Sequence, residues 1–365
     1  MATYKIINKN AIDALKEIPS ESVDCIITSP PYYGLRNYKG ADTIWDGDPN
    51  CKHNFINNFC SKCGAWKGQL GMEPTYQLYI NHLMNITREL KRVLKKTGTM
   101  FWNMGDTYAG GHTGGSIYNK NRKISKLNAI PQINIGRPQS NIKQMGIKEK
   151  SLMLIPERFA MAMISDGWIL RNKIIWRKIN AVPSNVKDRF SNKWEYVFFF
   201  TKNKKYYFDL DAVRKPYSNK TKMILKSAKN SKYLENYVYS LTSLRSRDVL
   251  LNPLGANPGD IITTHIIPHK ENHTAIYPET LITPFIKAGC PKPGVVLDPF
   301  AGSGTTGVVA DILGRNSILI EISPEYCDII KERFKKENVK KVADMLLKKG
   351  KITEAEYNEW NKQNR

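Results

Sequence analysis

The sequence predicts an α/β fold with a mostly parallel, twisted sheet, helices on both faces of the sheet, and a smaller lobe. Three observations predict it. Short apolar runs typical of buried strands alternate with segments of helical periodicity. Some of these runs end abruptly at Pro or at an acidic residue, as strands do at the rim of an open sheet. The 365 residues also suffice for one large domain and a smaller lobe.

The N-terminal region begins with alternating elements, in the order strand 4–7, helix 11–18 and strand 23–28. Apolar residues at helical spacing then predict a long helix over 74–96, with Pro74 in its first turn. Gly98 is expected to break this helix before a strand at 99–104. Strand, helix and strand at this spacing are typical of βαβ units in a parallel sheet.

The rest of the chain continues the alternation, with helix 156–166, strand 168–176, strand 196–201, helix 280–288, strand 294–297, helix 305–313 and strand 317–320. A further helix is capped by Ser323-Pro324-Glu325. The tail from 339 reads as a helical hairpin broken at Gly350, with a capping box, Thr353-x-x-Glu356, before its last helix.

The formal charge of +23 is the strongest feature of the composition, and it favours a polyanion as partner with salt-dependent affinity. No apolar run approaches the roughly 18 residues of a membrane span, and the N-terminus has no signal-peptide pattern. We therefore expect no membrane association and a cytoplasmic location.

Basic residues and tyrosines alternate over 202–260, which suits phosphate contacts and stacking on bases. The alternative is a solvated face with tyrosines packed beneath it. The tyrosines concerned are Tyr206, Tyr207, Tyr217, Tyr233, Tyr237 and Tyr239. Residues 112–150 lack any period and are expected to form a flexible loop.

Four metal-ligand side chains occur close together in the sequence, at Cys51, His53, Cys60 and Cys63. Three thiols and one imidazole suit tetrahedral Zn²⁺, and four protein ligands leave no open position for an activated water. The site is therefore expected to be structural. The alternative is a set of free thiols beside an incidental histidine. Six cysteines are too few and too clustered for a disulfide scaffold of this size.

The turn after strand 23–28 reads Thr28-Ser29-Pro30-Pro31-Tyr32. Two prolines forbid continuation of helix or ladder, so the chain leaves the sheet at the rim where ligands bind in open α/β sheets. The hydroxyl and the rigid carbonyls can accept hydrogen bonds from an exocyclic amine, and the aromatic ring can stack on the base that carries this amine. Ser29, Pro30, Pro31 and Tyr32 are the candidate catalytic residues, with Thr28 beside them as a candidate cofactor contact.

A second turn follows strand 294–297 and is rich in glycine, which permits close backbone approach to a ligand. No Lys follows its second Gly, which argues against a Walker-type triphosphate loop. Glu321 ends the next strand about 20 residues later, where an acidic residue hydrogen-bonds a ribose diol. The candidate cofactor-binding residues are Asp298, Phe300, Gly302, Ser303, Gly304, Thr305, Thr306 and Glu321.

The two turns together resemble those of the DNA amino-methyltransferases, and their order, Ser-Pro-Pro-Tyr first, resembles the circularly permuted β group. The resemblance covers most of residues 1–338 and implies a Rossmann-like fold. It also implies methyl transfer from S-adenosylmethionine to an exocyclic amine of a base flipped out of double-stranded DNA. In the family, a His/Pro segment matching His273 packs against the methionine end of the cofactor. A satisfied structural histidine is equally consistent with His273.

Ser at the first position of the motif is commoner among cytosine-N4 enzymes, so Ser29 favours cytosine N4 over adenine N6. Cys25 and Cys290 lack the context of an attacking cysteine, which argues against ring-carbon methylation. A catalytically silent DNA-binding subunit on the same scaffold is a competing hypothesis, and RNA is a competing substrate. A restriction endonuclease partner and a homodimer formed through the tail are compatible with the resemblance.

These expectations divide the chain into six parts. They are the catalytic half 1–111 with a zinc-binding insertion at 45–70, the loop 112–150, the continued catalytic domain 151–201, the target-recognition region 202–260, the cofactor-binding half 261–338, and the helical tail 339–365.

Overall fold

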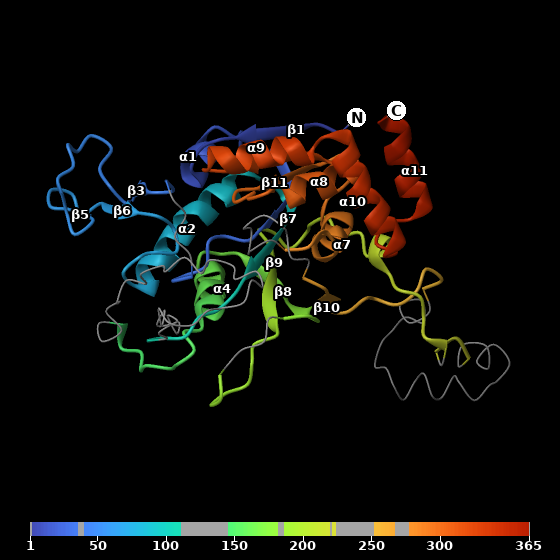
Figure 1. The fold of residues 1–365 in the computed structure, drawn as a ribbon, viewed down its shortest axis with the longest axis horizontal. Coiled ribbons are helices and arrows are strands. Elements are labelled where there is room, and N and C mark those ends of the chain that lie inside the picture. The colour runs from blue at the N-terminus through green and yellow to red at the C-terminus, as the bar shows by residue number, and fades with distance from the viewer. Residues whose placement is uncertain are drawn as a thin grey trace, which may run out of the picture.

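A computed structural model describes residues 2–35, 40–110, 145–181, 186–219, 221–223, 252–266 and 277–364. Its centre is an eight-stranded sheet (Figure 1). In spatial order the strands are β1 (Tyr4–Ile7), β12 (Asn316–Ile320), β11 (Val295–Asp298), β2 (Val23–Thr28), β7 (Leu94–Met104), β9 (Trp194–Thr201), β8 (Ile169–Lys178) and β10 (Ile261–Thr264). Five of the seven pairings between these strands are parallel, and β9 runs antiparallel to both of its neighbours, so the predicted mostly parallel sheet is confirmed.

Helices cover both faces of the sheet, as predicted. Successive residues of a strand point to opposite faces, and Cys25 and Ile26 of β2 accordingly belong to different apolar clusters. The cluster around Ile26 contains α1 (Ala11–Lys16), α2 (Tyr76–Val93) and α4 (Ile155–Ser165). The cluster around Cys25 contains α7 (Glu279–Gly289), α8 (Thr305–Ile312), α10 (Lys336–Lys348) and α11 (Glu354–Gln363).

The start of β7 differs from the prediction, because Gly98 does not separate helix from strand. Helix α2 ends at Val93, and β7 runs from Leu94 through Gly98. The register of β7 against β2 shifts between Val23 and Cys25, which brings Gly98 against β2. A Cβ at Gly98 would lie 3.0 Å from the Asp24 carbonyl oxygen, so this glycine permits close approach inside a strand.

The N-terminus of α2 also differs from the prediction. Thr75 is the cap, and its side chain accepts a hydrogen bond from the Leu78 N–H, so Pro74 lies outside the helix. The remaining predicted helices and strands agree with the structure to within a few residues. Ser323 caps α9 (Pro324–Arg333), and the capping box of Thr353 and Glu356 is present.

The predicted zinc-binding insertion folds as a small antiparallel sheet that projects from the main body (Figure 1). Its spatial order is β3 (Thr43–Trp45), β6 (Trp66–Gly68), β5 (Phe59–Cys60) and β4 (Phe55–Ile56). Residues 43–70 are called the ribbon below.

The C-terminal tail packs on its own domain. Trp360 of α11 is buried, and its indole N–H donates to Asp311 of α8 at 3.0 Å. Tyr206 and Phe208 likewise pack on Phe199 of β9, so this part of the predicted recognition region covers the main sheet. Most of the predicted loop 112–150, and Tyr233, Tyr237 and Tyr239, lie outside the described residues.

Candidate active site

The two predicted turns meet at one rim of the sheet. Strands β2 and β11 are parallel neighbours, with Leu297 opposite Ile26, so their carboxyl ends lie side by side. The Thr28 hydroxyl donates a hydrogen bond of 2.7 Å to Asp298 Oδ1 across the gap. Residues 270 positions apart in the sequence are thereby joined where open α/β sheets bind ligands.

Asp298 organises the glycine-rich turn from within. Besides Thr28, the hydroxyls of Thr306 and Tyr277 donate to its carboxylate at 2.6 and 2.8 Å, and the Phe300 N–H donates at 3.1 Å. Burial raises the pKa of Asp298 above its ordinary value, while these donors favour the ionised form. Asp298 is enclosed in protein and therefore shapes the turn from beneath it.

A cavity of about 310 Å³ opens at this rim, a size within the range of small-molecule sites. Of the predicted residues, it is lined by Ser29, Pro31, Phe300, Gly302, Ser303 and Glu321. Thr28, Pro30, Asp298, Gly304, Thr305 and Thr306 are buried behind that wall, and the predicted catalytic residue Tyr32 does not line the cavity either. His273 lies outside the described residues.

Other residues that were not predicted as site residues also line the cavity: Lys9, Asn10, Ala11, Gly40, Ala41, Thr43, Trp45, Gln69, Leu70, Pro299, Ile320, Ile322, Ser323, Pro324, Glu325 and Tyr326. Lys9 and Asn10 follow shortly after the first predicted strand, and a position just beyond a strand end could have indicated that they lie at the ligand-binding rim. No local pattern indicates that Trp45 or Gln69 should reach the cavity, because a separate insertion carries them there.

Glu321 ends β12 and closes one side of the cavity. Its carboxylate accepts hydrogen bonds from the Gly302 N–H at 2.8 Å and the Ser323 N–H at 2.9 Å. Burial raises the pKa of Glu321 to about 7, although both N–H groups favour the charged form. A carboxylate at the end of β12, the strand that follows the glycine-rich turn and α8, suits a ligand with a diol.

The Ser-Pro-Pro-Tyr turn is fixed by its neighbours. The Tyr79 hydroxyl donates to the Pro31 carbonyl at 2.7 Å. The Tyr32 hydroxyl lies 2.9 Å from Asn103 Oδ1 and 3.0 Å from Glu195 Oε2, and it accepts a hydrogen bond from Ser29 at 3.2 Å. Burial raises the pKa of Tyr32 well above its ordinary value, so the phenol remains neutral at physiological pH.

Asn103 and Glu195 were not predicted as site residues. Asn103 also donates to the Tyr196 carbonyl at 2.9 Å, and Glu195 is ion-paired with Lys178. These side chains come from β7, β9 and β8, three adjacent strands on one side of β2. The pairing of those strands brings Asn103, Glu195 and Lys178 together around the Tyr32 hydroxyl. The spacing of these residues along the chain does not indicate that they meet.

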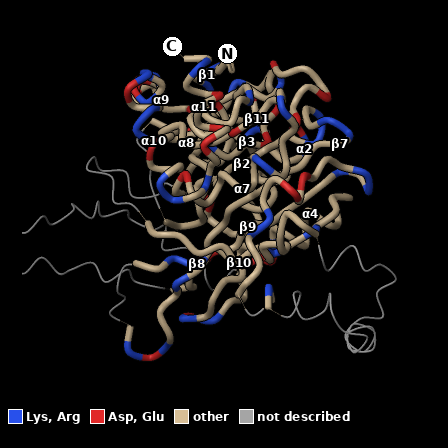
Figure 2. Tube along the Cα trace, turned by 90° about the vertical axis from the view of Figure 1, so that its right-hand side faces the viewer, with Lys and Arg blue, Asp and Glu red and all other residues tan. Residues whose placement is uncertain are grey.

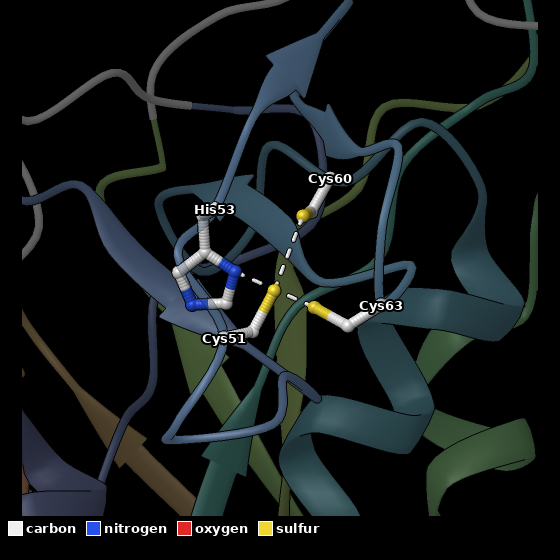
Figure 3. Close-up of side chains that lie close together, drawn as sticks. All are labelled: Cys51, His53, Cys60 and Cys63. Atoms are coloured by element: carbon white, nitrogen blue, oxygen red, sulfur yellow. Dashed lines mark hydrogen bonds between the residues drawn. The ribbon is translucent and has the colours of Figure 1, made fainter.

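The four predicted metal ligands come together in the ribbon. Figure 3 shows their ligand atoms directed toward one another, and these atoms lie within 4.8 Å of each other. Cys63 Sγ lies 3.4 Å from His53 Nδ1, and Cys51 Sγ lies 3.9 Å from Cys60 Sγ. Three sulfurs and one imidazole nitrogen at such distances fit a tetrahedral zinc ion.

The two cysteines considered for ring-carbon attack are core residues. Cys25 and Cys290 are fully buried, and neither lines the cavity. Burial raises the pKa of Cys25 to about 12, and it also raises the pKa of Cys290. A thiol of this kind is a poor nucleophile, because the thiolate is the reactive form.

The surface charge is distributed widely. Figure 2 shows Lys and Arg positions around strand β8 and on many other elements. Strand β8 alone carries Arg171, Lys173, Arg177 and Lys178. Among the described residues, no helix is long and apolar enough to cross a membrane.

A parallel sheet that brings a Ser-Pro-Pro-Tyr turn and a glycine-rich turn to one cavity defines a methyltransferase of Rossmann-like fold. The sequence profile of the DNA methylase family matches residues 23–332. The chain is 34% identical to the type II methyltransferase M.SmaI of Serratia marcescens, over 92% of this chain and 91% of that one. It is 35% identical to M.Cfr9I of Citrobacter freundii, over 90% and 87% of the two chains.

The chain therefore belongs to the DNA methylase family that modifies cytosine N4 or adenine N6, and it is an S-adenosylmethionine-dependent DNA methyltransferase. Among solved structures, the PvuII DNA methyltransferase, described as cytosine-N4-specific, superposes with a TM-score of 0.56 at 17% identity. That superposition covers 94% of this chain and 91% of the other, and it shows a shared fold. The family and the Rossmann-like fold expected from the two motifs are confirmed.

Proposed function

We propose that this enzyme methylates N4 of a cytosine flipped out of double-stranded DNA. The observation that carries the proposal is the hydrogen bond between Thr28 and Asp298, which sets Ser29 and Pro31 at the cavity that Gly302 and Glu321 also line. Base and cofactor would then meet at the rim between β2 and β11. Extrusion of the base is required because an amine inside the duplex cannot reach such a rim.

S-adenosylmethionine supplies an electrophilic methyl group when bound in the cavity. Glu321 is proposed to accept hydrogen bonds from its ribose hydroxyls. Backbone groups of the glycine-rich turn, held by Asp298, would form the opposite wall, and His273 is proposed to contact the methionine end. The volume of about 310 Å³ and the acidic group at the strand end fit such a molecule.

The target amine is a weak nucleophile because its lone pair is delocalised into the ring. Ser29 Oγ and the Pro30 carbonyl are proposed to accept its two hydrogens, which favours a pyramidal nitrogen with a localised lone pair. Tyr32 is proposed to stack on the base, as aromatic side chains do on flipped or single-stranded bases. Orientation of amine and methyl group in line supplies much of the rate enhancement.

Cytosine is preferred over adenine because the first residue of the motif is Ser29. The PvuII enzyme named as cytosine-N4-specific is a distant relative in sequence, so its specificity adds little to this preference. Adenine N6 remains the second candidate, because it also presents an amine beside a ring nitrogen.

Residues 202–260 are proposed as the target-recognition region, between the continued catalytic domain 151–201 and the cofactor-binding half 261–338. The basic strand β8 lies next to the edge strand β10, which begins where this region ends, so both can face one DNA duplex. The names of the type II relatives support a paired restriction endonuclease, and their bacterial sources support a cytoplasmic location. The proposal of a homodimer rests on the tail alone.

Cys51, His53, Cys60 and Cys63 are proposed to bind one structural Zn²⁺. Ligand atoms within 4.8 Å of one another, two cysteines in a Cys-x2-Cys turn and a closed set of four ligands support it. Zinc analysis of the purified protein, with Cys60→Ser as the variant expected to lose the metal, tests this site.

Nucleoside analysis by mass spectrometry tests the proposed reaction. Unmethylated bacterial DNA is incubated with the enzyme and deuterated S-adenosylmethionine, then digested to nucleosides. Labelled N4-methylcytosine is the expected product, and Tyr32→Ala is the matched negative control. Labelled N6-methyladenine would establish the second candidate instead, and label in RNA alone would reject DNA as the substrate.

A further inference from the structure

We infer that the metal-binding ribbon is a wall of the cofactor cavity, so that zinc and cofactor each strengthen the binding of the other. The inference rests on the proposed cofactor and zinc sites. Four cavity-lining residues belong to the ribbon, namely Thr43, Trp45, Gln69 and Leu70. The four metal ligands lie between these two pairs in the sequence, so the metal closes the loop that joins them.

The metal ligands fix strand β5 and the segments beside it. Cys60 belongs to β5, and its N–H donates to the Ala65 carbonyl at 2.7 Å in the turn toward β6. The Ser61 N–H donates to the Asn54 carbonyl at 2.9 Å, next to the ligand His53. A metal held by all four side chains therefore locks β5 and its turn to the segment that contains Cys51 and His53.

Strands β6 and β3 transmit this order to the cavity. Strand β6 pairs with β5 through Trp66 and Phe59, and it pairs with β3 through Trp66 and Trp45. The Trp45 indole N–H also donates to the Gly68 carbonyl at 3.0 Å. Trp45 is buried and is held at the cavity from two sides, by α2 and by β6, whose other edge is held by the metal-bearing strand.

The far end of the ribbon reaches the catalytic turn. Gln69 and Leu70 line the cavity, and the Gly71 carbonyl then accepts a hydrogen bond from the Gly34 N–H at 2.7 Å. A Cβ at Gly71 would lie only 2.9 Å from the Tyr32 carbonyl oxygen, so the backbones are in close contact there. The ribbon thus borders the cofactor cavity and supports the turn that carries Ser29 and Tyr32.

The ribbon has few interactions of its own that could stabilise its fold. Its strands contain two or three residues each, and Ile56 and Phe59 are exposed. Isolated hairpins of this size are marginal in water, and metal ligation commonly supplies the missing folding energy of such units. Loss of the metal should therefore loosen β5 and β6 and, through them, the wall formed by Trp45 and Gln69.

The base of the ribbon has a second anchor that does not involve the metal. Asp46 accepts a hydrogen bond from Asn85 at 2.7 Å, and Trp45 stacks on the buried His82 of α2 at 4.5 Å. This anchor should keep the base of the ribbon attached to α2 of the main domain without zinc. The metal-free protein is then a usable reagent, with a loosened cavity wall.

Calorimetric titration with S-adenosylhomocysteine tests the coupling. Metal removal by chelation is expected to weaken its affinity about tenfold, within the usual range of coupling between sites, and added Zn²⁺ should restore it. Cys60→Ser should behave like the chelated protein. Lys62→Ala, an exposed substitution in the same turn that removes no ligand, should behave like the wild type.

Reciprocity provides a second measurement on the intact holoprotein. Saturating S-adenosylhomocysteine should tighten zinc binding by the same factor, measured as equilibrium competition with a chromogenic chelator. This measurement needs no substituted protein, and circular dichroism of the chelated protein verifies that the metal-free form it compares is folded, since unfolding would itself couple zinc to any native-state ligand.

The outcomes separate the proposals. Unchanged cofactor affinity without metal, together with unchanged zinc affinity at saturating ligand, would overturn the coupling and leave the cofactor site intact. No binding of S-adenosylhomocysteine to any form would reject the cofactor site itself. A protein that takes up no stoichiometric zinc would overturn both the metal site and the coupling.

Discussion

Glu321 is the residue whose protonation should control cofactor binding near neutral pH. Its carboxylate accepts two backbone hydrogen bonds, yet burial raises its pKa to about 7. Ribose hydroxyls donate to a carboxylate, so the ionised form is the one that binds. Because the pKa is raised, that form predominates above pH 7 and is lost as the pH falls below it.

S-adenosylhomocysteine affinity should therefore decrease as the pH is lowered from 8 to 6, approaching about tenfold per pH unit below 7. Glu321→Gln should bind more weakly and show a flat profile. Glu321→Ala should lose about 1–3 kcal/mol of binding free energy. Calorimetry at several pH values checks this, and a wild-type profile that matches Glu321→Gln would contradict it.

Tyr32 joins the proposed base-stacking position to Asn103 and Glu195. Tyr32→Ala should abolish measurable turnover, because it removes the ring and leaves two polar side chains without their hydroxyl partner. Tyr32→Phe keeps the ring and should lower kcat/KM by about tenfold, as expected for one lost hydrogen bond. Both variants should bind S-adenosylhomocysteine like the wild type. A tenfold loss of cofactor affinity in Tyr32→Phe would place the hydroxyl in the cofactor site instead.

Which site residues could be predicted from the sequence depends on how local their signals are. Ser29 and Glu321 end predicted strands, and the structure places both at the cavity. Thr28, Asp298 and Thr306 belong to the same motifs, but their side chains bond to one another behind the wall. Whether a motif residue faces ligand or core is decided by packing, which the motif does not reveal.

The glycine-rich turn is held by a buried ion pair between two helices. Arg333 of α9 donates to Glu279 of α7 at 2.7 Å, and it donates to Ser303 Oγ and Thr305 Oγ1 at 2.8 and 2.9 Å. Glu279 is almost fully buried, so removal of Arg333 leaves an uncompensated charge. This contact links two helices to the turn between β11 and α8.

Arg333→Ala should lower the free energy of unfolding by about 3–5 kcal/mol, as for other broken buried pairs. The matched control is Lys331→Ala on the same helix, whose pair with Asp328 is exposed to solvent and should contribute little to stability. Urea denaturation of the two variants checks this. Equal losses in the free energy of unfolding would show that the buried pair stabilises the fold no more than the exposed pair does.

The elements themselves were largely predictable, because their periodicity and caps are local properties. Helix α9 with its Ser323 cap and α11 with its capping box agree with the sequence. Gly98 was misjudged because a glycine can end a helix or permit close packing within a strand. The contact with Asp24 that distinguishes these roles comes from another strand.

The net charge of +23 acts over the whole molecule and should make DNA affinity depend steeply on salt. Proteins that make about 6–10 phosphate contacts lose about 10³–10⁵ in affinity between 50 and 200 mM salt. We expect a decrease of at least about tenfold over that range, measured by fluorescence anisotropy with a duplex. S-adenosylhomocysteine affinity, as the control, should change little. A flat DNA profile would rule out phosphate contact as the main source of affinity.

The order of strands in the main sheet is the property that the sequence could not predict. Alternating strands and helices indicate a parallel sheet, but they do not say that β9 reverses or that β1 lies at an edge beside β12. These pairings join segments far apart in the chain. Only the resemblance to the permuted methyltransferases indicated that the two halves exchange places.

The edge pairing of β1 with β12 has a consequence for biosynthesis. The Thr3 N–H bonds to Asn316 across 313 residues, and β2 likewise pairs with β11 from the last third of the chain. A nascent chain therefore carries strand edges without their partners through most of translation. Domains of such high contact order fold slowly and expose aggregation-prone edges meanwhile. This enzyme should thus depend on chaperones while the ribosome completes its C-terminal half.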